Sequence, residues 1–288
     1  TLGRNGSQNL VDLFNRFGIG CVAEHEPPDL PLRQIGYWSF FRKRGWLGPT
    51  SRVAAVGSRF QRRFIASDVM IGRGKALRWV DDGDEAKLRA LAARRLARIR
   101  KFERAGCLHY LEAGPYFLRT YGHQTFELAP DLGLVKLTRD PLRNAKSFVN
   151  RGKDIFANAL PPDRPCNILR IEKWQNLSKF QLYLHQWFET ELRFVQFVET
   201  HDVSRVVRLT TPELSDPARM HQVFSFFSIE HRSLEDLQAT NTAAEHGKQM
   251  TTVDERDIAE FEAFVRLVPQ NLLSRILPLR DYDPVAGL

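Results

Sequence analysis

Sulfur-containing residues are scarce in this 288-residue sequence, which has three cysteines and three methionines. The cysteines (Cys21, Cys107 and Cys166) form no CxxC pair and are odd in number. A disulfide framework is therefore not expected, and a reducing, cytoplasmic location is favoured. No apolar run approaches the roughly 18 residues of a membrane-spanning helix. The sequence also lacks HExxH, an acidic calcium loop and clustered Cys/His ligands, so no metal is expected.

Acidic residues are the minority charge: 34 Asp and Glu stand against 42 Lys and Arg, which gives a net charge of +8 and a pI of about 9.6. This balance favours an anionic partner, such as a nucleotide, an acidic sugar, a nucleic acid or an anionic membrane surface. No recognised nucleic-acid-binding motif is present, so a nucleic acid is not the expected partner.

Predicted strands and helices alternate along the chain. Helices are expected at 84–105, 178–200 and 217–228, and strands at 107–113, 132–140 and 204–210. This order favours an α/β fold with a mostly parallel central sheet and helices on both faces. We expect one domain over residues 1–288, interrupted by a mostly helical insertion at 31–106. Residues 1–3 are expected to end a first strand, so further chain upstream of Thr1 is also expected.

The first ten residues, TLGRNGSQNL, place two glycines ahead of a predicted helix. Backbone N–H groups in such a turn can bind an anion together with the helix dipole, and the loop side chains can add donors. These residues are Arg4, Asn5, Gly6, Ser7, Gln8 and Asn9. The alternative is an ordinary strand-to-helix turn with Asn5 or Ser7 as the N-cap. The GKS or GKT of a nucleoside triphosphatase is absent.

A second candidate site follows the strand predicted at 132–140. Arg139 ends this strand and Ser147 follows eight residues later on the next predicted helix. The carboxyl ends of parallel strands form the ligand-binding edge of open α/β sheets, and arginine suits phosphate groups. The alternatives are a surface ion pair of Arg139 with Asp140 and a solvent-facing Ser147.

Together the two motifs resemble those of the sulfotransferases that use 3′-phosphoadenosine 5′-phosphosulfate (PAPS). GRNGSQNL is similar to the family's loop PKSGTTWL or RSGTTxL, and the Arg139–Ser147 spacing is similar to its 3′-phosphate motif. Downstream, RVVRLTTPELSDPARMHQVFSFFSIE looks like the family stretch that leads to FLGL. The similarity covers about residues 1–30 and 107–230. A faint echo of the C-terminal capping loop, NTAAEHGKQ, suggests Lys248 as a further cofactor ligand.

The resemblance implies a P-loop-like three-layer fold and sulfuryl transfer from PAPS to an acceptor hydroxyl or amine, without a metal. Arg4 and the loop N–H groups are expected to stabilise the leaving phosphate and the sulfuryl oxygens. The insertion is then expected to lie on the acceptor side. The stretch YLEAGPYF resembles EKSxxYF of heparan-type members, so the favoured acceptor is a carbohydrate, possibly an anionic glycan.

Three residues are candidates for the general base that the acceptor needs. Glu112 lies in YLEAGPYF, and Glu26 lies in CVAEHEPP at a position similar to the catalytic Glu of tyrosylprotein and bacterial members. His25 adjoins Glu26, and imidazole is suited to proton transfer near neutral pH. Strand alternation predicts that His109 and Glu112 face different sides.

Two other functions remain open. A P-loop kinase-like phosphotransferase would need a loop lysine and a metal-binding carboxylate, and neither is evident. The second function is that of a basic binding protein that has the same fold but no catalytic activity. The helix at 84–105 is expected to carry a solvated basic face, or alternatively to attract an anionic acceptor.

Overall fold

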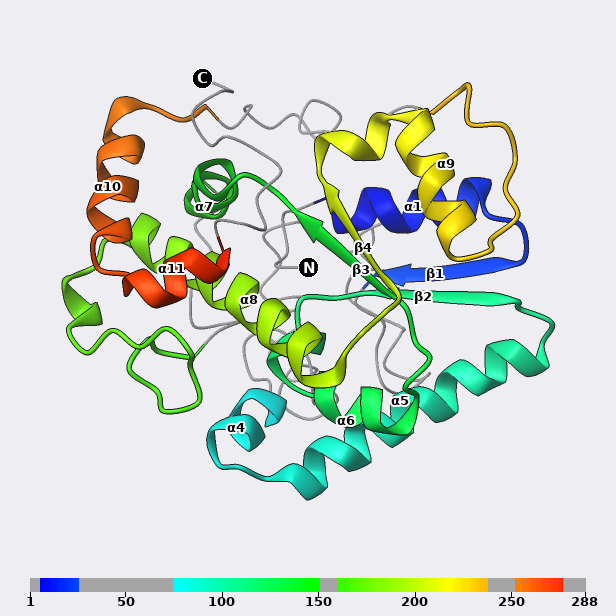
Figure 1. The fold of residues 1–288 in the computed structure, drawn as a ribbon, viewed down its shortest axis with the longest axis horizontal. Helices are drawn as coiled ribbons and strands as arrows, with labels where there is room; N and C mark the ends of the chain where they lie inside the picture. The colour runs from blue at the N-terminus through cyan, green and yellow to red at the C-terminus, as the bar shows by residue number, and fades with distance from the viewer. Residues whose placement is uncertain (1–5, 26–74, 151–159, 238–251, 277–288) are drawn as a thin grey trace, which may run out of the picture.

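The computed structural model describes residues 6–25, 75–150, 160–237 and 252–276 (Figure 1). Several predicted features lie outside the described residues: Arg4, Asn5, Glu26, Lys248, the strand end at 1–3, and residues 31–74 of the predicted insertion.

Four short strands form two parallel pairs. β1 (Cys21–His25) pairs with β2 (His109–Ala113), and β3 (Leu134–Thr138) pairs with β4 (Val206–Thr210). Figure 1 shows the two pairs meeting near the centre of the molecule, with helices on their upper side and on their lower side. The predicted α/β class and parallel pairing are confirmed. The described strands form two two-stranded sheets rather than one continuous sheet.

Helices α1 (Ser7–Phe17) and α9 (Pro217–Phe226) cover one face of the strands. Phe14 of α1 contacts Phe224 of α9, with 4.9 Å between ring centroids. Their apolar sides share one buried cluster with residues from all four strands, including Ala23, Leu137 and Leu209. Both sheets therefore contribute to a single core beneath α1 and α9.

The other faces of the strands meet different helices. α5 (Glu85–Arg104) packs against β2, and α8 (Lys179–His201) lies behind β3 and β4. Lys136 of β3 is 3% exposed and forms an ion pair with Glu191 of α8. Neighbouring Leu137 points to the opposite core, as strand alternation requires.

The α8 helix is stabilised by a cap at its N-terminus and by burial of its side chains. Ser178 and Gln181 form a capping box at its start. Trp187 and Phe188 are buried in a second core. That core also contains α7 (Pro141–Val149), α10 (Glu255–Val265) and α11 (Gln270–Ile276).

The remaining described elements connect these layers. They are α4 (Lys75–Asp81), α6 (Gly122–Leu128) and three short 3₁₀ turns at Phe117–Arg119, Trp174–Asn176 and Pro212–Ser215. The predicted helix at 84–105 is confirmed as α5, and Asp84 is its N-cap, accepting a hydrogen bond from the Lys87 backbone N–H at 3.1 Å.

Candidate active site

A left-handed glycine turn precedes the first residue of α1. Gly6 has φ 83° and ψ 21°, the left-handed conformation that favours glycine. A Cβ built on it would lie 3.1 Å from Leu214 Cδ1 and 3.4 Å from Thr211 Cγ2. The left-handed conformation therefore favours glycine at this position, and a side chain there would be tightly placed against Leu214. Because Gly6 is the N-cap residue, no side chain at that position accepts a hydrogen bond from the first-turn N–H groups of α1.

Ser7 joins this turn to the carboxyl end of β1. Its Oγ lies 2.9 Å from Nε2 of His25, the last residue of the strand. Ser7 is 5% exposed, so the contact is largely shielded from water. The structure thus brings together two residues that the sequence assigned to different roles, a cofactor donor and a candidate base.

Other residues of the predicted loop already belong to α1. The Gln8 side-chain amide donates to Asp12 Oδ1 at 2.9 Å, one turn along the helix. The Gln8 side chain is therefore directed along the helix, and only the Gln8 backbone belongs to the turn. Asn9 lies in the first turn of α1 and is half-buried.

Backbone hydrogen bonds place the α1 turn and Arg139 at one edge of the strands. Thr211, which contacts the Gly6 position, donates its backbone N–H to the Thr138 carbonyl at 2.9 Å. Arg139 follows Thr138 directly. The ends of β3 and β4 and the start of α1 therefore converge at the carboxyl edge, where open α/β sheets bind ligands.

Arg139 enters a turn that the following helix stabilises. Its carbonyl accepts a hydrogen bond from Trp187 Nε1 at 2.9 Å, and Asp140 caps α7 through the Arg143 backbone N–H at 2.8 Å. Burial and, secondarily, the charge of Arg143 lower the pKa of Arg139. The neighbouring carboxylate of Asp140 opposes this shift in the pKa of Arg139. Ser147 on α7 is 5% exposed, so it is not a solvent-facing helix residue.

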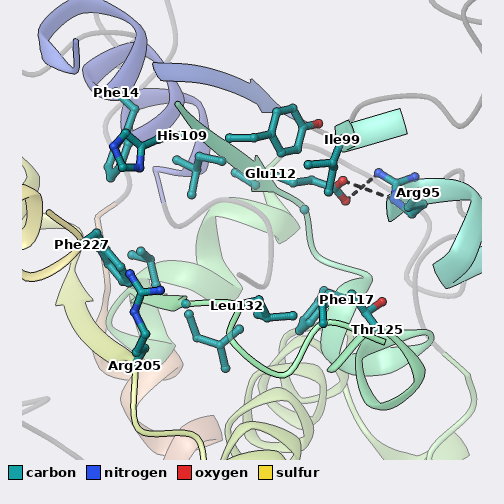
Figure 2. Close-up of a pocket in the computed structure, with 18 of the residues that line it drawn as sticks. Phe14, Arg95, Ile99, His109, Glu112, Phe117, Thr125, Leu132, Arg205 and Phe227 are labelled. Atoms are coloured by element: carbon teal, nitrogen blue, oxygen red, sulfur yellow. Dashed lines mark hydrogen bonds and ion pairs between the residues drawn. The ribbon is translucent and has the colours of Figure 1, made fainter. Parts of the chain in front are cut away.

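Glu112 lies on the other face of the strands from His25. Its Oε1 is 2.6 Å from Arg95 Nη2 and 2.7 Å from the Tyr121 hydroxyl, and its Oε2 is 3.3 Å from Arg95 Nε (Figure 2). The carboxylate is thus held by a forked arginine of α5. His109 instead shares its strand face with Leu111 and Ala113, which pack against the core beneath α1 and α9, so the two residues face different sides as predicted.

A second carboxylate, which the sequence analysis did not single out, stands beside Glu112. Glu24 is its partner in the β1–β2 register. Glu24 lies 2.6 Å from Arg98 Nη2 and accepts a hydrogen bond from the Tyr110 hydroxyl at 2.6 Å. Burial, and then the nearby carboxylates, raise the pKa of Tyr110, so its phenol remains a donor. The sequence signal for this pair of carboxylates was Arg95 and Arg98, which lie three residues apart on one side of α5.

These contacts revise the interpretation of the basic helix. Arg95 is 6% exposed and Arg98 is largely buried, because both point at strand carboxylates. The predicted solvated basic face is therefore wrong for these two residues, although Arg89 and Arg100 are exposed. The arginines of α5 that face the sheet attach the helix to it through these ion pairs.

A cavity of about 480 Å³ lies between β2 and β3 (Figure 2). Glu112 and His109 line it, but Ser7, His25 and Arg139 do not. The cavity is therefore distinct from the carboxyl-edge site.

Within the described ranges, no three His, Cys, Asp or Glu side chains group closely enough to hold a metal ion. Among the same residues, no helix combines the length and apolarity needed to cross a membrane. Comparison of the chain with models of protein families, with curated proteins and with solved structures found no match.

Proposed function

We propose that this chain is a PAPS-dependent sulfotransferase with a P-loop-like fold, and that a carbohydrate is its favoured acceptor class. The observation that carries the proposal is the convergence of two anion-binding elements at one edge. The turn at Gly6 opens α1, and Arg139 emerges from β3 beside it through the Thr211–Thr138 contact.

Two separate anion sites fit an adenosine 3′,5′-bisphosphate better than a triphosphate. The α1 N–H groups, with Arg4, are the proposed ligands of the 5′-phosphosulfate, because helix N-termini favour anions. Arg139 and Ser147 are the proposed ligands of the 3′-phosphate. Burial of Ser147 and the lowered pKa of Arg139 support this assignment, since both indicate a desolvated site. Lys248 remains a proposed ligand from outside the described residues.

Of the candidate bases, His25 has the contact most directly linked to the cofactor turn. Its Nε2 lies 2.9 Å from Ser7 Oγ at the proposed cofactor turn, whereas the Glu112 carboxylate binds Arg95 and Tyr121 on the other face of the strands. Glu112 and Glu26 remain the alternatives. In the proposed reaction the base takes the proton of the acceptor hydroxyl, the acceptor oxygen bonds to sulfur, and the sulfur–oxygen bond to the 5′-phosphate breaks. The bisphosphate leaves, stabilised by the N–H groups of α1 and by Arg4.

Thermal denaturation with adenosine 3′,5′-bisphosphate tests the cofactor assignment. Ligand at about a hundredfold its Kd should stabilise the folded chain by about 2.7 kcal/mol, which is a rise of several degrees in Tm. Arg139→Gln should abolish most of this rise. Arg100→Gln removes an equal charge from the exposed face of α5 and should leave the rise intact.

The same titration separates the alternatives. A larger rise with ATP and Mg²⁺ than with the bisphosphate would favour a kinase-like phosphotransferase. A rise with the bisphosphate but no sulfate transfer from PAPS to any glycan, phenol or amine acceptor would favour a non-catalytic binding protein. No rise with millimolar bisphosphate would contradict the sulfotransferase proposal.

A further inference from the structure

Two histidine side chains meet at the surface of α9, away from the proposed cofactor turn. Nδ1 of His221, in the middle of α9, lies 2.8 Å from Nε2 of His231, and the contact is exposed. The main chain of His231 forms an antiparallel bridge with Gly18, which precedes β1. The two histidines, which we call the His221–His231 pair, therefore lie toward the amino ends of the strands, opposite the carboxyl edge.

One hydrogen bond fixes which nitrogen of His231 can act as a ligand. His231 Nδ1 lies 2.8 Å from the Arg232 carbonyl, which can only accept, so Nδ1 carries the proton. Nε2 of the neutral imidazole therefore keeps its lone pair and faces His221. Histidines that bind metals in proteins almost always donate their other ring N–H to a carbonyl or a carboxylate. The Arg232 carbonyl thus prepares His231 Nε2 for a metal ion.

The segment that carries His231 is held by helices on two sides. Arg232 donates its backbone N–H to the Phe17 carbonyl at 2.9 Å, which joins the segment to the end of α1. The imidazole of His231 stacks on Phe224 of α9, with 5.1 Å between ring centroids. Because these contacts already fix the imidazole beside α9, little further ordering is needed when an ion binds.

The distance between the two facing nitrogens favours one coordination geometry. Imidazole nitrogens bind zinc at about 2.0–2.1 Å, so two of them would lie about 2.9 Å apart at a right angle and about 3.3 Å apart at a tetrahedral angle. The observed separation of 2.8 Å is closer to the right-angled arrangement. Square-planar and tetragonal coordination, with ligands at right angles, is typical of Cu²⁺ and Ni²⁺.

Two imidazoles supply only part of a coordination shell. Within the part of the chain that the structure describes, no third His, Cys, Asp or Glu completes a metal-binding group with them. The remaining positions are therefore left to water, which can reach the exposed side chain of His221. Mg²⁺ and Ca²⁺ prefer oxygen ligands, so the pair offers them little.

We propose that the His221–His231 pair binds a divalent transition-metal ion, Cu²⁺ or Ni²⁺, through His221 Nδ1 and His231 Nε2. The proton on His221 Nδ1 moves to Nε2 of the same ring by exchange with water, so that both facing nitrogens present a lone pair to the ion. The bound ion cross-links α9 to the segment that bridges Gly18, and it stabilises the folded chain by mass action. The ion takes no part in the proposed sulfuryl transfer.

Titration of the full chain with NiCl₂, followed by calorimetry and by thermal denaturation, tests the proposal. Ni²⁺ should bind and raise Tm, and MgCl₂ at the same concentration should do neither. His221→Asn and His231→Asn should each weaken Ni²⁺ binding at least about tenfold, because loss of an outer-shell partner alone costs about 10–100-fold.

The matched control is His123→Asn, which should leave Ni²⁺ binding unchanged. His123 Nδ1 also lies 2.8 Å from a second histidine, His201, but it is half-buried against Phe197. Unchanged Ni²⁺ affinity in both His221→Asn and His231→Asn would overturn the proposal. So would a loss of affinity in His123→Asn alone.

Nuclear magnetic resonance provides a second measurement that needs no altered chain. Cu²⁺ is paramagnetic and broadens the signals of nearby amides. Substoichiometric CuCl₂ should broaden the amides of 17–19, 220–222 and 230–232 first and leave those of α10 sharp. Broadening that begins elsewhere would contradict the proposal. Neither measurement involves the bisphosphate or sulfate transfer, so the proposal can fail independently of the proposed function.

Discussion

Ser7 Oγ and His25 Nε2 lie 2.9 Å apart and join the first turn of α1 to the end of β1. Ser7 belongs to the proposed cofactor-binding turn, and His25 is a proposed general base. A second contact joins α1 to β1 further along the helix. The Asn15 side chain donates to the Ala23 carbonyl and accepts from the Ala23 N–H, both at 2.8 Å. The hydrogen bonds fix β1 along α1, so His25 is held at the carboxyl edge by the fold itself.

Replacing His25 with Asn should separate binding from turnover. Loss of a general base lowers kcat by about 10²–10⁴-fold, while adenosine 3′,5′-bisphosphate should still raise Tm. His221→Asn changes an exposed histidine on α9 and should leave both properties unchanged. Sulfate transfer from labelled PAPS provides the measurement. Full activity in His25→Asn together with inactivity in Glu112→Gln would transfer the role to Glu112, and full activity in both would exclude both residues.

Gly6→Ala should damage the cofactor turn more than the general fold. The left-handed conformation costs a non-glycine residue about 1–2 kcal/mol, and the added methyl meets Leu214 at 3.1 Å. Gly83→Ala is the matched control, because Gly83 has φ +67° but a Cβ there would meet nothing within 4 Å.

Urea unfolding and bisphosphate titration check this pair. The free energy of unfolding should fall in both variants because of the left-handed conformation, and only Gly6→Ala should also bind the bisphosphate more weakly. Equal affinities for the bisphosphate in the two variants would show that the α1 turn does not hold the ligand.

The sequence sufficed to predict elements whose local chemistry agrees with their final environment. The 84–105 helix has an N-capping Asp84 and a strong helix-forming composition, and it forms as α5. The strand at 204–210 and the helix at 217–228 form as β4 and α9, and Asp216 caps the latter. Alternation along β2 also predicted correctly that His109 and Glu112 diverge.

Long-range partners could not be predicted in this way. Nothing local to Glu112 reveals that Arg95 and Tyr121 will hold it, or that Glu24 will stand beside it in the next strand. Ser7 and His25 are 18 residues apart, and only the packing of α1 on β1 brings them into contact. The Arg139–Ser147 spacing suggested a shared ligand, but the burial of Ser147 depends on the helices packed around α7, which spacing does not encode.

Breaking the α5–sheet ion pair should be costly. Arg95→Met leaves Glu112 beside Glu24 with its forked partner removed, and loss of one member of a buried pair costs about 3 kcal/mol. Arg89→Met removes an arginine from the exposed Arg89–Glu127 pair and should cost less than about 1 kcal/mol.

The double variant Arg95→Met with Glu112→Gln should recover part of the loss, because no carboxylate without a charged partner then remains at that position. Urea unfolding of the single and double variants gives the coupling free energy directly. Strictly additive effects would show that the pair does not stabilise the contact between α5 and the sheet.

Stability should fall on mild acidification because of His185. This residue is 2% exposed, and its Nε2 lies 2.7 Å from the Leu169 carbonyl, so it donates as the neutral imidazole. Burial lowers the pKa of His185 below its usual 6.5. Between the lowered folded pKa and the unfolded pKa, the unfolded chain binds more protons, so the free energy of unfolding decreases as the pH falls below about 7.

The variant His185→Gln keeps a donor for Leu169 but does not titrate. It should show a flatter dependence of the free energy of unfolding on pH from 7 to 5 than the unaltered chain. His123 contributes in the same direction, since burial and then His201 lower its pKa. The slope should therefore shrink further when His123→Gln is added. Identical slopes for all three proteins, measured by urea unfolding at matched ionic strength, would show that these histidines are not the acid-sensitive groups of the fold.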